Sequence, residues 1–210
     1  MVQGEGLNLG TPSTLIRLSQ CNLRCDFCDS KYTWQDEKEM SIDEVIAEVN
    51  KYNCHHIMIS GGEPLLQQDD LIKLMEQLLE TNLFYTFEIE SNGTIVPKKR
   101  LAELTDLFTI SPKFNQTLEY NSVFNHIEDL AERPQIVFKF VVDKGDDFAQ
   151  ILTFVYKNNK AGHEVFLMPC ATSVIEMAER LKFITDFAKE YNFRVTPRLQ
   201  ILTYGNKRGT

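Results

Sequence analysis

The stretch Thr-Leu-Ile-Arg-Leu-Ser-Gln-Cys-Asn-Leu-Arg-Cys-Asp-Phe-Cys, residues 14–28, joins a short apolar run to three cysteines with the spacing CxxxCxxC. The apolar run predicts a buried strand, and the loop after it carries Cys21, Cys25 and Cys28. A closed electron-transfer cluster and a structural zinc both require four protein ligands, whereas three thiolates would leave one iron of a [4Fe–4S] cluster open. The spacing therefore predicts an enzyme in which a small molecule completes the coordination of that iron.

Composition and charge limit the class of protein. The chain has 210 residues, of which 43% are hydrophobic, which suits one sizeable core and a single domain over residues 1–210. A net charge of -8 disfavours nucleic acid as a partner, because nucleic-acid binders usually present a basic face. No apolar run approaches the ~20 residues of a membrane span, and residues 1–6 do not resemble a secretory signal. Five cysteines, three of them clustered, fit a reducing compartment, so we expect a cytoplasmic protein without a membrane partner.

Strand-like and helix-like segments alternate along most of the chain. The predicted strands cover residues 15–18, 57–60, 84–90, 107–111, 136–142, 164–168 and 193–202. The predicted helices cover residues 41–52, 69–81, 98–104, 123–131, 148–158 and 174–191. This alternation is typical of βαβ crossovers and a largely parallel sheet. Because about six units are fewer than the eight of a complete barrel, we expect an α/β fold, an incomplete TIM-type barrel.

Glycine or polar clusters follow four successive predicted strands. After the cysteines come Ser60-Gly61-Gly62-Glu63-Pro64, then Glu90-Ser91-Asn92-Gly93-Thr94, then Ser111-Pro112-Lys113. Taken singly, Gly-Gly and Asn-Gly are ordinary turn formers. In a barrel, however, the carboxyl ends of the strands meet at one face, where the chemistry takes place. The shared position of the clusters therefore predicts one site at that face.

These motifs resemble the radical S-adenosylmethionine superfamily, in which CxxxCxxC carries an aromatic residue, here Phe27, before its last cysteine. Within the superfamily the chain is similar to the 7-carboxy-7-deazaguanine synthase family, with matches at residues 3–6, 17, 28–30, 33–34, 90–94, 111–113 and 205–209. The resemblance implies a lyase that contracts the ring of 6-carboxy-5,6,7,8-tetrahydropterin, releases ammonia and forms 7-carboxy-7-deazaguanine for queuosine or deazapurine biosynthesis. It also implies a [4Fe–4S] cluster and S-adenosylmethionine, which is regenerated in each turnover.

The resemblance also implies roles for individual residues. Cys21, Cys25 and Cys28 would ligate the cluster, and no side chain would be catalytic, because the radical comes from the cofactor. The residues expected to contact the adenosyl cofactor are Phe27, Asp29, Gly61, Gly62, Glu63, Gly93, Ser111, Pro112 and Lys113. Those expected to contact the substrate are Val2, Gln3, Gly4, Arg17, Ser91 and Thr210.

For four of these residues the expectation is more specific. The Gly61-Gly62 backbone, with no side chain in the way, would approach the methionyl amine. Glu63 is expected to cap or hydrogen-bond the glycine turn rather than act as a base. Arg17 is expected to lie buried in its strand, where a substrate carboxylate would pair with it.

Ser30 stands where the family places a hydroxyl ligand to Mg²⁺, and Asp29 is a rival oxygen donor that the sequence does not rank against it. The resemblance further implies a homodimer and a flavodoxin- or ferredoxin-type electron donor.

Two other functions compete with this interpretation. One is a radical enzyme that activates a glycyl radical on a partner protein, although such enzymes generally lack the matching motifs at both ends of this chain. The other is a non-enzymatic module in which Cys54 or Cys170 completes a zinc site. Both cysteines are more typical of small buried hydrophobic residues.

Overall fold

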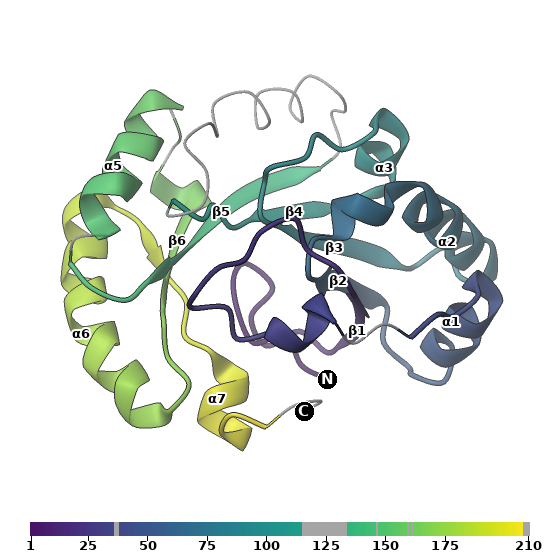
Figure 1. Ribbon diagram of the computed structural model, residues 1–210, viewed down its shortest axis with the longest axis horizontal. Helices are drawn as coiled ribbons and strands as arrows, with labels where there is room; N and C mark the ends of the chain where they lie inside the picture. The colour runs from purple at the N-terminus through teal and green to yellow at the C-terminus, as the bar shows by residue number, and fades with distance from the viewer. Residues whose placement is uncertain (36–37, 115–133, 146, 159, 161, 208–210) are drawn as a thin grey trace.

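The computed structural model describes residues 1–35, 38–114, 134–145, 147–158, 160 and 162–207 (Figure 1). Its strands form one parallel sheet in the order β1 to β7. The strands are β1 (Ser13–Leu18), β2 (His56–Gly61), β3 (Thr86–Ser91), β4 (Leu107–Ile110), β5 (Gln135–Val142), β6 (Val165–Pro169) and β7 (Arg194–Val195). The expected incomplete barrel is confirmed, with β1 at one edge of the sheet and β7 at the other.

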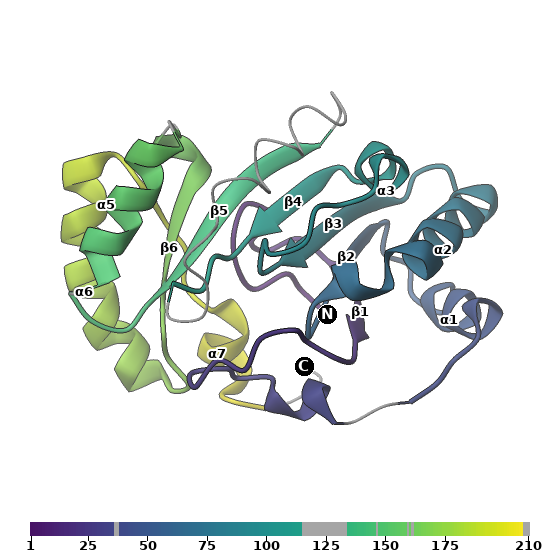
Figure 2. The same cartoon turned by 45° about the horizontal axis from the view of Figure 1, so that its top comes forward.

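Helices cover the outside of the curved sheet. Figures 1 and 2 show α1, α2 and α3 outside one half of the sheet, and α5 and α6 outside the other. The helices are α1 (Ile42–Val49), α2 (Gln68–Thr81), α3 (Lys99–Leu104), α5 (Asp147–Lys157), α6 (Val174–Tyr191) and α7 (Leu199–Tyr204), with short 3-10 turns η1 (Lys31–Trp34), η2 (Pro64–Gln67) and η3 (Gly162–Glu164). No helix among the described residues is long and apolar enough to cross a membrane.

Alternation along the strands separates an apolar outer face from a polar inner face. In β3, Phe87 and Ile89 join the core under the helices, while Glu88 and Glu90 point to the opposite side. The inner face packs against the N-terminal segment, residues 1–12, where Asn8 donates to Glu88 at 2.9 Å. Polar side chains at the carboxyl ends of the strands are thereby directed into the lumen of the barrel.

Local signals explain where the helices begin. Ser41 caps α1 through a capping box: its Oγ accepts from the Glu44 N–H, and the Glu44 carboxylate accepts from the Ser41 N–H at 2.7 Å. Ser173 and Glu176 form the same box at α6. Each box satisfies backbone donors that the first turn of a helix leaves open.

Two predicted strands differ from the structure. The expected strand over residues 193–202 is wrong after Val195, because α7 begins at Leu199. Pro197 has no N–H to continue the ladder, which explains the early end of β7. The expected strand over residues 84–90 begins at Thr86, with Phe84 77% exposed. The predicted helix over residues 123–131 lies outside the described residues.

Candidate active site

The three cysteines lie together in the loop that follows β1, here called the cysteine loop (residues 19–30). Gln20, whose φ is 69°, turns the chain out of the strand, and its N–H donates to the Thr33 carbonyl at 2.7 Å. Cys25 is buried and Cys21 and Cys28 are half-buried, and all three are free thiols. The Leu23 N–H points at Cys21 Sγ at 3.4 Å. The loop thus presents three free sulfurs at the carboxyl end of β1.

The surroundings of the sulfurs fit an iron–sulfur cluster. Burial raises the pKa of Cys25 and Cys28, while the nearby Lys113 ammonium works in the opposite direction. Bare thiolates are therefore disfavoured here, and cationic irons would stabilise them. Within the described residues no three Cys, His, Asp or Glu side chains could hold a single metal ion. A [4Fe–4S] cluster asks for a different arrangement, because each thiolate binds its own iron.

Gly61 and Gly62 bring the end of β2 against the cysteine loop. A Cβ at Gly61 would lie 2.1 Å from the Leu18 carbonyl oxygen, and one at Gly62 would lie 1.8 Å from the Gln20 carbonyl oxygen. The Gly62 N–H donates to Leu18 at 3.0 Å, and Gly61 has a φ of 149° that favours glycine. Packing within the protein thus explains both glycines, while the expected approach to the methionyl amine stays a prediction.

Replacing Gly62 by alanine should therefore displace the cysteine loop. Overpacking of this kind costs about 1–3 kcal/mol, and we expect a lower thermal midpoint together with less iron bound per chain. Gly145→Ala is the matched control, because no atom lies within 4 Å of a Cβ built there. Equal iron content in the Gly62→Ala and Gly145→Ala proteins would contradict the packing argument.

Glu63 joins the end of β2 to the end of β3. Its carboxylate is fully buried and accepts from the Leu65 N–H at 3.0 Å, the Ser91 Oγ at 2.9 Å and the Asn92 N–H at 2.7 Å. Burial raises the Glu63 pKa, and these hydrogen bonds oppose the shift. The expected capping role of Glu63 is confirmed, since its side chain caps η2 directly after the glycine turn, while its other two bonds reach the end of β3. The Ser91 hydroxyl in turn accepts from the Gly93 N–H at 3.0 Å, in a turn where Gly93 has a φ of 75°.

Arg17 is exposed, so the expectation that it is buried is wrong. It lies on β1, an edge strand, where the barrel is open. It is aligned with Ser60 of β2 and so lies on the inner face. Its Nη1 reaches the Ser30 Oγ at 3.4 Å, and that hydroxyl donates to the Asp29 carboxylate at 3.0 Å. The structure thus brings Arg17, Asp29 and Ser30 together at the mouth of the lumen.

A buried charge cluster, Glu5, Glu90, Lys139 and Arg198, lies deeper in the lumen. The Lys139 ammonium contacts Glu5 at 2.7 Å and Glu90 at 2.8 Å. Burial alone would lower the Lys139 pKa, but the two carboxylates hold it above its ordinary range. For Glu5, burial would raise the pKa, yet Lys139 and Arg198 hold it far below the ordinary value of a glutamate. Burial, with Glu5 and Glu88 nearby, raises the Glu90 pKa despite Lys139.

Sequence reasoning did not assign a role to this cluster. One signal was present, because Lys139 is the single charged residue within the apolar strand β5. Another was the period-two placement of Glu88 and Glu90 in β3. Charged side chains are seldom fully buried without a partner, so both signals indicate an ion pair inside the barrel.

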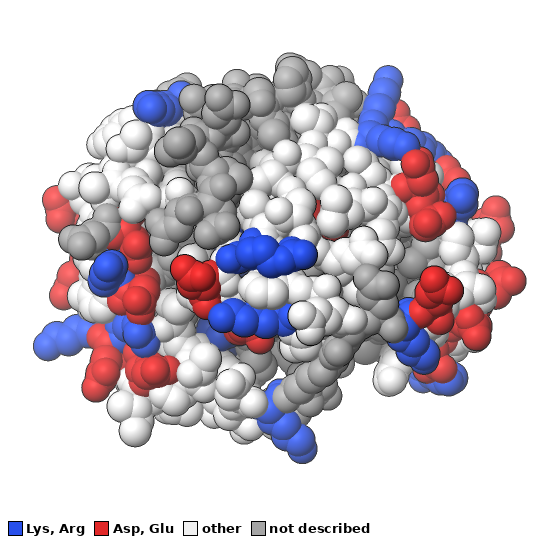
Figure 3. All heavy atoms as spheres, in the orientation of Figure 1, with Lys and Arg blue, Asp and Glu red and all other residues white. Residues whose placement is uncertain are grey.

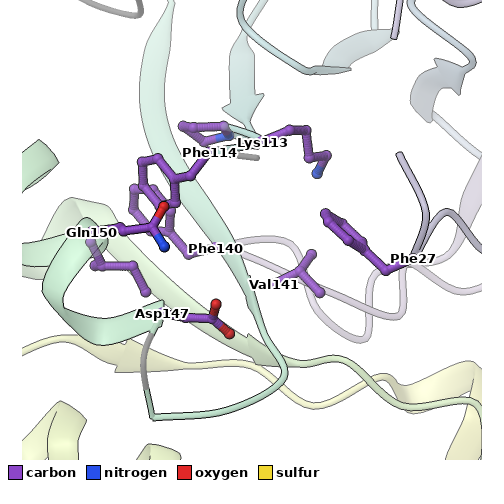
Figure 4. A pocket seen from close by; sticks show the side chains of 9 residues that line it. Phe27, Lys113, Phe114, Phe140, Val141, Asp147 and Gln150 are labelled. Atoms are coloured by element: carbon purple, nitrogen blue, oxygen red, sulfur yellow. The ribbon is translucent and has the colours of Figure 1, made fainter. Parts of the chain in front are cut away.

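An open pocket adjoins the cysteine loop (Figure 4). Phe27 and Lys113 face it from one side, and Asp147 and Gln150 of α5 face it from the other. Pro112 also lines it, so three of the residues predicted to contact the cofactor meet at one pocket. Basic side chains gather at the centre of this face of the molecule, although the whole chain is acidic (Figure 3).

The residues of the N-terminal segment that were expected to contact the substrate lie in different surroundings. Gln3 is buried, with its Nε2 2.6 Å from Met58 Sδ, and Val2 is exposed in a bridge to Pro12. Gly4 accepts from the Leu199 N–H at 2.9 Å, where a Cβ would overlap the Gln200 side chain. Thr210 lies outside the described residues.

Comparisons with known proteins agree with this geometry. A model of the Radical SAM superfamily matches residues 15–169. The 7-carboxy-7-deazaguanine synthase of Pyrobaculum aerophilum is 36% identical over 99% of this chain and 93% of its own length. That of Halobacterium salinarum is 34% identical over 98% of this chain and 88% of its own length. The crystal structure of QueE from Escherichia coli has a TM-score of 0.70 at 22% identity, covering 95% of this chain and 90% of that one, and supports the fold.

The fold and the three-cysteine loop define a radical SAM enzyme, whose cofactors are a [4Fe–4S] cluster and S-adenosylmethionine. The relatives narrow the class, because two synthases match nearly the whole chain. The chain belongs to the 7-carboxy-7-deazaguanine synthase family. Neither a zinc module nor an enzyme that activates glycyl radicals is favoured.

Proposed function

We propose that the chain converts 6-carboxy-5,6,7,8-tetrahydropterin to 7-carboxy-7-deazaguanine with release of ammonia, as a step of queuosine or deazapurine biosynthesis. The observation that carries the proposal is the cysteine loop at the mouth of a polar lumen, in a chain whose relatives bear the synthase name. When bound, the cluster and S-adenosylmethionine supply a 5′-deoxyadenosyl radical that takes a hydrogen atom from the substrate. The protein binds, orients and shields the reactants.

Cys21, Cys25 and Cys28 are the proposed cluster ligands. We propose that the adenosyl cofactor contacts the three residues of the pocket named above, Phe27, Pro112 and Lys113. The other proposed contacts are Asp29, Gly61, Gly62, Glu63, Gly93 and Ser111. Phe27 is 40% exposed beside the pocket and offers a flat apolar surface to a ring. Lys113 is a cation whose pKa burial and the neighbouring Lys139 lower. It is placed to balance the charge of the thiolates.

The substrate side of the proposed site is the inner face beneath the cysteine loop. Arg17 offers a guanidinium at its mouth, which suits bidentate pairing with the substrate carboxylate. Buried Gln3 and Ser91 would contact the substrate on this inner face, together with Val2, Gly4 and Thr210.

Arg17→Gln should raise the KM for the carboxypterin roughly tenfold or more, because a charge-assisted pair to the carboxylate is lost. Arg17→Lys keeps the charge but lacks the paired donors of the guanidinium, so its KM should lie between those of the wild type and Arg17→Gln. The measurement is steady-state kinetics on anaerobically reconstituted enzyme at matched iron content. An unchanged KM in Arg17→Gln would place the substrate carboxylate elsewhere.

We propose Ser30 as the protein ligand to Mg²⁺, with Asp29 as its rival. Both oxygens lie together, but the Arg17 and Arg198 guanidinium groups lie against them. The Ser30 and Asp29 oxygens would suit Mg²⁺ once the substrate carboxylate lies in the site and offsets the positive charges of the two guanidinium groups.

We further propose a cytoplasmic homodimer that receives its electron from a flavodoxin- or ferredoxin-type protein. The exposed Arg24 in the cysteine loop would suit an acidic redox partner. Sedimentation tests the dimer, and reduction with each donor tests the electron source.

The function is tested by anaerobic reconstitution followed by mass spectrometry. About four irons per chain, a spectrum that changes on adding S-adenosylmethionine, and product of the mass of 7-carboxy-7-deazaguanine are expected. A loaded cluster without this product would overturn the substrate assignment, and a colourless zinc protein would overturn the enzyme itself.

A further inference from the structure

Arg198, between β7 and α7, contacts three segments that lie far apart in the sequence. Its Nε donates to the Glu5 carboxylate at 3.0 Å and its Nη1 donates to the Ala171 carbonyl at 2.7 Å. Its Nη2 pairs with the Asp29 carboxylate. Only 11% of the side chain is exposed. One guanidinium therefore ties the N-terminal segment, the cysteine loop and the loop after β6 to each other.

Two of the three groups that Arg198 contacts are held in place by other parts of the structure as well. Glu5 also accepts from Lys139 at 2.7 Å and from Gln200 at 2.7 Å, and Ala171 contributes a backbone carbonyl. Asp29, in contrast, is 44% exposed, and its carboxylate also accepts from the adjacent Ser30 hydroxyl. The Asp29 end should therefore swing toward solvent when the guanidinium is removed.

The contacts of the cysteine loop show why that end matters. On the β2 and β3 side the loop is held by several bonds, such as Glu63 N–H to Gln20 at 2.8 Å and Asn22 Nδ2 to Thr94 at 2.7 Å. On the β6 and β7 side of the described chain, Arg198 supplies the salt bridge through Asp29, which directly follows Cys28. The support of the loop on the β6 and β7 side, within the described residues, thus depends on one side chain.

We propose that Arg198 is a positioning residue that holds the cysteine loop in register with the N-terminal segment. The inference rests on the proposed function, in which the loop carries the cofactor side of the site and the segment carries the substrate side. Removing Arg198 should leave the cluster bound but uncouple S-adenosylmethionine cleavage from turnover. Uncoupled cleavage takes one electron from the dithionite of the assay and one hydrogen atom from a buffer component, and releases methionine and 5′-deoxyadenosine.

The first test is the amount of 5′-deoxyadenosine released per 7-carboxy-7-deazaguanine formed, with iron content and thermal midpoint measured on the same preparations. We expect at least a tenfold rise for Arg198→Met and a smaller one for Arg198→Lys, which keeps the charge. Arg100→Met is the control, because Arg100 of α3 pairs with Glu76 of α2 at 2.7 Å on the outside of the barrel. A ratio in Arg198→Met equal to that of wild type would overturn the proposal.

The second test needs no product and so stands even where the substrate assignment fails. Hydrogen exchange of the reconstituted protein should be faster over residues 20–30 in Arg198→Met, with β2 to β5 unchanged. Uniformly faster exchange would reveal general destabilisation and overturn the positioning role. Asp29→Asn removes the same contact from the loop side, and should give the same local pattern if Arg198→Met does not fold.

Discussion

Lys139→Met should lower the free energy of unfolding by about 3–5 kcal/mol at neutral pH, because it leaves Glu5 and Glu90 buried without their shared cation. Chemical denaturation measures this loss. Lys51→Met is the matched control, because Lys51 forms an exposed pair with Glu48 and should change stability by less than about 1 kcal/mol.

The loss in Lys139→Met should shrink as the pH falls toward 4.5, the ordinary pKa of a glutamate. The wild-type Glu5 pKa is depressed by Lys139 and Arg198, so its stabilising contribution is complete above that value and disappears only at lower pH. Without Lys139 the buried carboxylates bind protons more readily in the folded state, and the neutral forms need no cation. A loss that is equal at pH 7 and pH 5 would contradict the role given to the ion pairs.

Cys25→Ala should abolish 5′-deoxyadenosine formation, because two thiolates cannot hold the cluster in a reactive state. Cys25 is also the most buried of the three cysteines in the loop, and the chain has no fourth cysteine at ligand spacing to replace it. Anaerobic iron analysis and chromatography of the nucleoside measure the result.

Cys54→Ala is the control for this prediction, since Cys54 lies before β2, at the opposite end of that strand from the glycine turn. It should keep both iron and nucleoside formation. Activity retained in Cys25→Ala, or iron lost in Cys54→Ala or Cys170→Ala, would show that the ligand set is different.

The parts of the site that short motifs carry were predictable from the sequence. The cysteine loop, the Gly61-Gly62 turn and the Glu63 bond to the Leu65 N–H each depend on residues a few positions apart, whereas the Glu63 bonds to Ser91 and Asn92 join residues far apart in the sequence and were not predicted. The parallel sheet followed from the alternation of strand and helix patterns.

Contacts between distant segments were not predictable in this way. The sequence around Lys139 or Arg198 does not indicate that Glu5 is their partner, because these residues meet only when the barrel closes. The exposure of Arg17 follows from the place of β1 at the sheet edge, which is a property of topology. The helix α7 was missed because Val195, Leu199 and Ile201 fit an alternating pattern, while Pro197 marked the true break.

The meeting of the N-terminal segment with the residues around α7 has a consequence for folding. Gly6 donates to Thr196 at 2.8 Å and Gly4 accepts from Leu199, so the lumen is closed by contacts that span almost the entire polypeptide. Such long loops carry a large closure entropy, and contacts of high sequence separation form slowly. Strand pairing can proceed from neighbour to neighbour during synthesis, but the lumen is completed only after α7 has left the ribosome.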